Sequence, residues 1–502
     1  MRREENRMPH AKTPAVKRLL WCIGTAAVLL AVCSKSSPLY PLNDWMDANI
    51  FYTMGKAMMN GSVLYRDVFD HKGPLLYLIY GLGWCVDHTG FLGVFLLEIV
   101  AFAAFLYWSL RVAEVFAGPL HPAWMLPAGI AAAAGQAFAH GGSAEEFCLP
   151  LLAWALYEVL RFAVKPLSDR YPVSLARVAA LGFGVGCVLW VKFTMMGFFL
   201  GWVLVLAVLY LRAGWLRQLG LSCAAYLGGM ALSTLPWLVY FGFNGALGDF
   251  FGVYFGDNLF LYSAGGQESA GFVTTIIAVV QKAYWGCHDT PLILALAVLG
   301  LVWLLYRRRF ACAASVLVLA LGLATTGFAR GAYHIYYFLP FAVFAAPGIA
   351  PLALATKKLP VSGHFLQKLL PLAGAAAALG FCLLTCHNVS QLLRPAEELP
   401  QYQFAAIMRE NGGGSLLNYG TLDGGFYTAA GVQPPCRFFC VTNLPMPEQR
   451  AQQDTLMQQG TVDYAVSLSP ALGERFDYTL IAQAEYDGGE GSVTWYLYRK
   501  NA

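Results

Sequence analysis

The chain has 502 residues, of which 58% are hydrophobic and 12% are charged, and its formal net charge is +4. The charged fraction is about half of that in ordinary soluble domains, and apolar runs long enough to cross a bilayer recur along the sequence. These features exclude a soluble domain and predict a polytopic α-helical membrane protein. No basic patch interleaved with aromatic residues is present, so nucleic-acid binding has no support.

The N-terminal segment is basic, and an apolar run from Leu19 to Cys33 follows it. No small-residue cleavage site follows this run, and many further spans do, so we interpret it as an uncleaved first helix with a cytoplasmic N-terminus. The next stretch, 35–90, is then the first external loop. The six cations before the run are Arg2, Arg3, Arg7, Lys12, Lys17 and Arg18.

Residues 74–116 contain two apolar runs, and the number of spans depends on whether both cross the membrane. The later basic residues fall on the cytoplasmic side only if the first run is a short interfacial helix and the second is a true span. We therefore predict eleven spans and an external C-terminus, with a re-entrant helix possible between Asp249 and His288. The spans are expected near 18–34, 91–113, 121–139, 147–164, 177–192, 195–212, 219–242, 289–306, 310–327, 335–355 and 366–386.

Residues 387–502 are richer in polar residues and contain no run of spanning length. Short β-rich pieces (VDYAVSL, YTLIAQAEY and SVTWYLYRK) surround a helical stretch, MPEQRAQQDTLMQQG. We predict a membrane domain over 1–386 and a small extracytoplasmic α/β domain over 387–502. Cys436 and Cys440 permit a local disulfide but lack the second pair of a structural zinc site.

Unusual polar residues fall on the external side of this topology in four places. Two are the loop 44–72, with carboxylates beside cations, and HGGSAEE at 140–146; the others are Lys192 and FARGAYHIYYFLP at 328–340. Charge at membrane depth is costly and usually faces the protein interior or a cavity. Carboxylates can act as a general base, and Lys and Arg can hold phosphate oxygens. A site with both suits transfer from a phosphate-activated lipid donor.

The loop also resembles a known family. Asp47, Phe51 and Met58, followed by YRDVFDHKGPLLY at 65–77, resemble the first external loop of the GT-C class of integral membrane glycosyltransferases. The likeness is to bacterial members related to protein O-mannosyltransferases and to the lipid A aminoarabinose transferase. GGSAEE at 141–146 and HIYY at 334–337 resemble later elements of these members. Where the aminoarabinose enzyme has two prolines after the loop lysine, this chain has Gly-Pro.

The resemblance implies a GT-C fold and transfer of a monosaccharide, with inversion, from a polyprenyl-phosphate donor to an acceptor of the bacterial cell envelope. It implies Asp47 as the catalytic base, with Asp44 as the alternative, and Lys72 near the donor phosphate. The charges of Arg330, Arg66 and Lys192 make them further candidates for the phosphate. The candidate substrate contacts are Asp70, His71, Glu145, Glu146, His334 and Tyr337.

No cofactor is required by this interpretation, although the carboxylates could hold a divalent cation. The expected partners are the donor lipid, an unidentified acceptor and the bilayer. Two other functions remain open: a lipid or sugar transporter or flippase, whose buried charges would mark a path, and a membrane-anchored binding protein acting through 387–502.

Each site candidate also has a purely structural interpretation. Asp47 suits the first turn of a helix, and Glu145 and Glu146 suit the positive end of a helix dipole. Lys72 and Arg66 could instead pair with neighbouring carboxylates or lie at the membrane interface.

Overall fold

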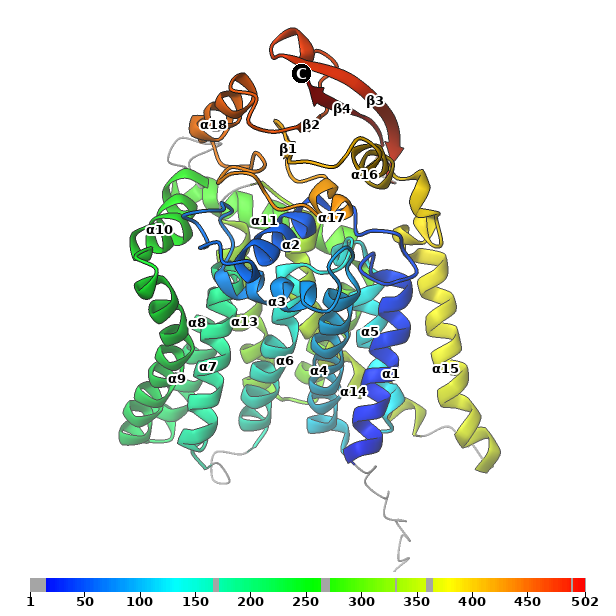
Figure 1. The fold of residues 1–502 in the computed structure, drawn as a ribbon. Helices are drawn as coiled ribbons and strands as arrows, with labels where there is room; N and C mark the ends of the chain where they lie inside the picture. Colours follow the sequence, from blue (N-terminus) through cyan, green and yellow to red (C-terminus); the bar gives the residue numbers. More distant parts are fainter. Residues whose placement is uncertain are drawn as a thin grey trace, which may run out of the picture.

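The computed structural model of the protein describes residues 15–165, 171–262, 271–329, 332–357, 364–488 and 491–501. These residues form three layers, which are a bundle of long helices, a pair of short helices across one end of the bundle, and a small sheet domain beyond them (Figure 1). The bundle helices are α1 (Ala15–Cys33), α4 (Leu92–Ala117), α5 (Leu126–Ala133), α6 (Ala144–Ala163), α7 (Leu175–Val191), α8 (Met196–Arg212), α9 (Leu216–Phe243), α12 (Pro291–Tyr306), α13 (Phe310–Phe328), α14 (Ala346–Thr356) and α15 (His364–Thr385).

Within the described ranges, six helices are long and apolar enough to cross a membrane. A seventh span results if α11 (Phe272–Asp289) and α12, which meet at a bend of 104°, cross together. The chain is therefore a multi-pass membrane protein. A helix lies at each of the eleven expected positions. The expected third span, however, consists of three short helices, Pro122–Met125, Leu126–Ala133 and Gln136–Phe138. The expected tenth span begins as a 3-10 helix over Ile335–Ala345.

The two short helices are α2 (Met46–Met59) and α3 (Pro74–Trp84). The 11 residues of α3 span about 16 Å, which is about half of the ~30 Å hydrocarbon layer, so this apolar run cannot cross the membrane alone. The two helices approach each other closely at Gly55. A Cβ added to this residue would lie only 2.4 Å from the Gly81 nitrogen. Ten consecutive residues of α2, from Ala48 to Ala57, are buried. A helix buried on all sides must be covered from both directions, here by the bundle and by the C-terminal domain.

The C-terminal domain contains a four-stranded sheet in the order β1-β2-β4-β3. Its strands are β1 (Leu416–Asn418), β2 (Tyr464–Ser467), β3 (Tyr478–Asp487) and β4 (Ser492–Lys500), and β1 and β2 are parallel while the other pairs are antiparallel. The helices α16 (Pro400–Glu410), α17 (Phe426–Ala430) and α18 (Pro447–Gln458) accompany it. The three expected strands and the expected helix are confirmed as β2, β3, β4 and α18. The three-residue strand β1 is too short to give a sequence pattern.

Polar contacts fasten α2 to the C-terminal domain. The Thr53 hydroxyl donates to Asp423 Oδ2 at 2.7 Å, and Lys56 Nζ donates to the Tyr427 and Val432 carbonyls at 3.0 and 2.5 Å. Burial lowers the pKa of Lys56 to about 8, against a smaller opposing effect of Asp423. Phe426 and Trp495 of the domain belong to the same hydrophobic core as the bundle helices. The domain is therefore packed onto the loop rather than tethered beside it.

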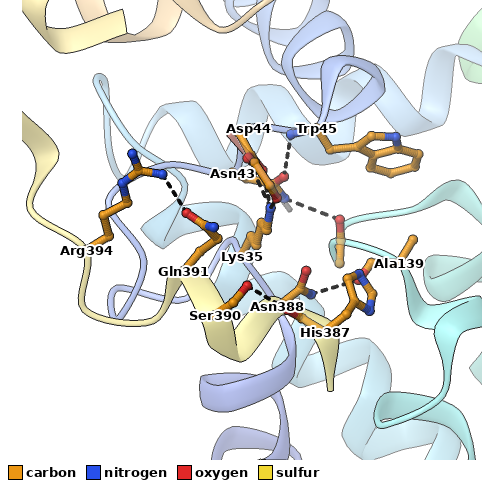
Figure 2. A network of polar contacts seen from close by, with 12 residues as sticks. Lys35, Asn43, Asp44, Trp45, Ala139, His387, Asn388, Ser390, Gln391 and Arg394 are labelled. Atoms are coloured by element: carbon orange, nitrogen blue, oxygen red, sulfur yellow. Dashed lines mark hydrogen bonds and ion pairs between the residues drawn. The ribbon is translucent and has the colours of Figure 1, made fainter. Parts of the chain in front are cut away.

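A buried ion pair completes this junction (Figure 2). Lys35 Nζ donates to both oxygens of Asp44, at 2.7 and 3.0 Å, and to the Gly488 carbonyl at 3.2 Å. The Tyr486 hydroxyl donates to Asp44 Oδ2 from β3. Burial would raise the pKa of Asp44, but Lys35, His140 and Tyr486 outweigh it and hold this pKa below its usual value. The pair thus joins the end of α1, the first loop and the sheet.

We expect Lys35→Met to loosen the C-terminal domain. Removing one partner leaves the Asp44 carboxylate buried and uncompensated, at a cost of about 3–5 kcal/mol. The thermal unfolding midpoint should fall, and protease should cleave near residue 387 faster. Arg475→Gln is the matched control, because it removes an exposed pair with Asp454 in the same domain and should have little effect. Equal midpoints for the two variants would contradict this role of the ion pair.

The junction also predicts a pH dependence. His140 stacks on Trp45 and faces Lys35, Asp44 and His387. Burial, together with the charge of Lys35, lowers the pKa of His140 to about 3. A lowered histidine pKa means that the unfolded chain binds more protons below the ordinary value of about 6.5, so this contribution to stability is complete above pH 6.5 and is lost as the pH falls toward 3. One such group contributes up to about 1.4 kcal/mol per pH unit. The unfolding midpoint of His140→Gln should fall less steeply than that of the wild type between pH 7 and 4, and parallel slopes would contradict the assignment.

Candidate active site

The turn that carries Lys72 is held on both sides. The Tyr77 hydroxyl accepts from the Lys72 amide at 2.8 Å, and the Tyr65 hydroxyl donates to the Lys72 carbonyl at 2.7 Å. Gly73 lies directly against the end of α7, where an added Cβ would be 2.0 Å from the Trp190 carbonyl oxygen. Only glycine permits this approach, and Pro74 then begins α3 with its preset φ. The Gly-Pro pair therefore brings Lys72 to the end of α7, next to Lys192.

Asp70, His71 and Lys72 form a chain of polar contacts. Lys72 Nζ lies 3.2 Å from His71 Nε2, and His71 Nδ1 lies 3.3 Å from Asp70 Oδ1. An ammonium can only donate, so Nε2 accepts and the ring proton belongs on Nδ1. Burial and the Lys72 charge lower the pKa of His71, which fits this neutral ring. Burial would raise the pKa of Asp70, but His71, Lys72 and the Tyr77 hydroxyl outweigh it and hold this pKa well below its usual value.

A second lysine near Lys72 comes from the helix bundle. Lys192, between α7 and α8, is buried and forms an ion pair with Glu145 in the first turn of α6. Its Nζ also lies 3.9 Å from the centre of the Tyr337 ring and 5.4 Å from that of Tyr336. A cation above aromatic rings in a desolvated place is stabilised by about 2 kcal/mol. Lys192 is thus held from two sides.

Asp47 lies in the first turn of α2 and faces the side chains around Lys192. The Tyr336 hydroxyl donates to Asp47 Oδ2 at 3.3 Å. The carboxylate also interacts electrostatically with His71 and His334, and Lys72 interacts with His334. The His334 ring lies 5.4 Å from Tyr336 and 5.3 Å from Tyr337, and burial lowers its pKa. Asp47 and the two lysines, with their partners Asp70 and Glu145, therefore share one polar cluster.

The structure brings together most of the expected site residues. Asp47, Asp70, His71, Lys72, Glu145, Lys192, His334 and Tyr337 belong to the cluster described above. Tyr336 was missed as a site candidate, although it stands beside Tyr337 in the same motif. Only its position in space shows that its hydroxyl reaches Asp47.

Three expected site residues are placed differently. Asp44 has both oxygens engaged by Lys35, and Arg66 is exposed, paired with Asp67 and with the Asn244 carbonyl. Glu146 accepts from the Gly142 amide at 2.9 Å and contacts Glu98 of α4. Glu98 in turn accepts from the Ser34 hydroxyl, so the two carboxyl groups belong to a buried contact between α4 and α6. Arg330 lies outside the described residues.

The described residues contain no group of three His, Cys, Asp or Glu side chains arranged to hold a metal ion. The cluster offers cationic side chains and one accessible carboxylate. This set suits an anionic group of a ligand better than a metal cation. Cys436 and Cys440 are free thiols in the structure.

Comparison with known proteins rests on structure alone. No protein-family model matches the chain, and no curated protein sequence matches it. A crystal structure of ArnT from Cupriavidus metallidurans bound to undecaprenyl phosphate matches with a TM-score of 0.60 and 15% identity, covering 96% of this chain and 98% of that one. The apo state of the same protein matches with a TM-score of 0.61 and 16% identity, covering 95% and 97%. The expected GT-C-like fold, with membrane helices and a small C-terminal domain, is confirmed.

We expect Gly73→Ala to disturb the site without removing any polar group. The backbone φ of Gly73 is −73°, which alanine adopts freely, so the cost comes only from the contact with the Trp190 carbonyl. Overpacking of this kind costs about 1–3 kcal/mol and should lower the unfolding midpoint. Gly220→Ala in α9 is the control, because its Cβ would meet nothing within 4 Å. A Gly73→Ala protein as stable as this control would show that the close approach is not needed.

Proposed function

We propose that this protein is a glycosyltransferase that moves a monosaccharide from a polyprenyl-phosphate donor to an acceptor outside the cytoplasm, with inversion. The observation that carries the proposal is the meeting of the Asp47 carboxylate with Lys72 and Lys192 in one cluster. An enzyme of this type needs a base for the acceptor and cations for the phosphate that leaves. The fold shared with an ArnT structure that holds undecaprenyl phosphate supports the class of donor.

In the proposed reaction, Asp47 takes the proton of an acceptor hydroxyl as its oxygen attacks the anomeric carbon. The new C–O bond forms on the face opposite the phosphate, and the old bond breaks with its electron pair going to the phosphate oxygen. Lys72 and Lys192 stabilise the negative charge that develops there, and Arg330 remains a further candidate from the sequence. Inversion follows because the two oxygens lie on opposite faces of the carbon.

The partners of the two aspartates favour Asp47 over Asp44 as the base. Both oxygens of Asp44 accept from Lys35, and its side chain is only 7% exposed. Asp47 is half-buried and accepts at 3.3 Å from Tyr336, a hydroxyl that can keep the carboxylate oriented. A base must reach the proton that it removes, and only Asp47 retains that freedom. Asp44 is instead a residue of the domain junction.

The orientation follows from the positive-inside rule. Arg18 pairs with Glu114 near the end of α4, and Arg309 donates to the Val164 carbonyl at the end of α6. These ends of α4 and α6 lie at the bundle end opposite the C-terminal domain (Figure 1). We place that end in the cytoplasm, and the cluster with residues 387–502 outside. Lipid-linked donors are accessible there, whereas soluble nucleotide sugars are not.

The test is sugar release from radiolabelled undecaprenyl-phosphate sugars by the purified protein, with a cell-envelope extract as the acceptor source. Asp47→Asn should lower the rate by about 10²–10⁴-fold, the usual contribution of a general base, while its unfolding midpoint stays near that of the wild type. Asp44→Asn is the matched control and should lower the midpoint more than the rate. Equal rates for Asp47→Asn and the wild type would remove Asp47 as the base. Movement of intact donor across vesicles without sugar release would instead favour a flippase.

A further inference from the structure

An open cavity of about 520 Å³, lined by charged, aromatic and apolar side chains, lies at the end of the bundle opposite the candidate active site. Its lining residues come from the first turn of α1 and from the C-terminal parts of α4 and α6, which lie at the lower end of the bundle in Figure 1. No step of the proposed reaction uses it. Its residues therefore need an explanation of their own.

The cavity wall is strongly cationic. Arg18, Arg111, Arg161 and Lys165 line it, against the single carboxylate of Glu114. This carboxylate is already fully engaged, because it accepts from Arg18 at 2.9 and 3.0 Å, from Arg111 at 2.8 Å and from the Leu120 amide at 3.2 Å. Four cations therefore line the cavity against one carboxylate, and Glu158, which pairs with Arg161, is not among the lining residues.

Two of these cations lie against the same aromatic ring. The guanidinium carbons of Arg111 and Arg161 lie 5.5 and 5.7 Å from the centre of the Tyr157 ring. Arg111 also donates to the Tyr157 hydroxyl at 3.2 Å, and Arg161 donates to Glu158 at 2.9 Å. Each guanidinium has more N–H donors than these contacts use, and these donors can form charge-assisted hydrogen bonds to an anion.

Arg18 adds an unused donor to this wall. Its side chain is 12% exposed, and its Nε is buried without a hydrogen-bond partner among the described residues. A buried N–H that lacks a partner costs about 1–3 kcal/mol. Arg18 is also one of the residues that line the cavity.

We propose that this cavity binds the phosphate of an anionic phospholipid headgroup. Guanidinium groups match phosphate oxygens in charge and geometry, and basic pockets between membrane helices on the cytoplasmic side suit such headgroups. The neighbouring turns of α1 expose large apolar side chains outward: Val16 is 70% exposed, Leu19 54% and Leu20 64%. A ligand at this place can therefore keep its acyl chains in the bilayer, which favours a lipid over a soluble phosphate compound.

The experiment measures lipid retention by the purified full-length protein with native mass spectrometry. Phosphatidylglycerol is the anionic probe and phosphatidylcholine the zwitterionic one. Arg111→Gln with Arg161→Gln should weaken phosphatidylglycerol binding by roughly tenfold or more and leave phosphatidylcholine binding unchanged. Arg212→Gln with Arg217→Gln is the matched control, because these exposed arginines lie at the same bundle end but do not line the cavity. The control should retain phosphatidylglycerol as the wild type does.

Two further arms keep the result decisive. Arg161→Gln alone leaves the Arg111–Glu114 pair intact, so a loss of phosphatidylglycerol in this variant cannot come from breaking that pair. Equal retention by the cavity variants and the control would overturn the proposal. Thermal stabilisation of the wild type by soluble glycerol 3-phosphate equal to that by phosphatidylglycerol would overturn the lipid as the ligand and assign the cavity to a soluble phosphate compound.

Discussion

The arrangement of this protein depends on the burial of α2. A 14-residue helix with Asn49, Thr53 and Lys56 along it cannot be buried by apolar packing alone, since each of these side chains needs a polar partner. The C-terminal domain supplies these partners through Asp423, Thr428 and the carbonyls near α17. Because Asp47 stands in the first turn of the same helix, its position is set by the bundle below and by the domain above.

The sequence predicts the bundle well because span length and the placement of basic residues are local properties. The run 74–84 shows this, since the placement of the later basic residues predicted a short helix there, and that helix is found. The third and tenth positions are predicted less well. Pro340 lies inside the 3-10 segment, and an extended Gly135 interrupts the other helix. Apolar composition shows that a segment is buried but does not show whether it is continuous.

The candidate site also contains residues that the sequence predicts well and residues that it does not. Asp47, Lys72, Lys192 and His334 converge because motif and topology place them at one end of the bundle. Asp44 and Glu146 could not be assigned from the sequence, because their roles depend on partners far along the chain. Asp44 meets Tyr486, which is 442 residues away, and Glu146 meets Glu98 on another helix. Two aspartates three positions apart thus belong to different parts of the molecule, and only the fold distinguishes them.

The contact between Lys56 and the Val432 carbonyl also has a consequence for biogenesis. These residues are 376 positions apart, and a ribosome adds about 5–20 residues per second, so Lys56 waits roughly 20–75 s for this acceptor to be synthesised. During that interval the membrane helices can insert and pack, while α2 keeps its lysine and amide groups in water. The polar cluster is therefore completed late, after the C-terminal domain has been made and has closed over the loop. Most of the membrane helices are therefore made well before the chain can hold Asp47 in place, although α15 ends only 47 residues before Val432.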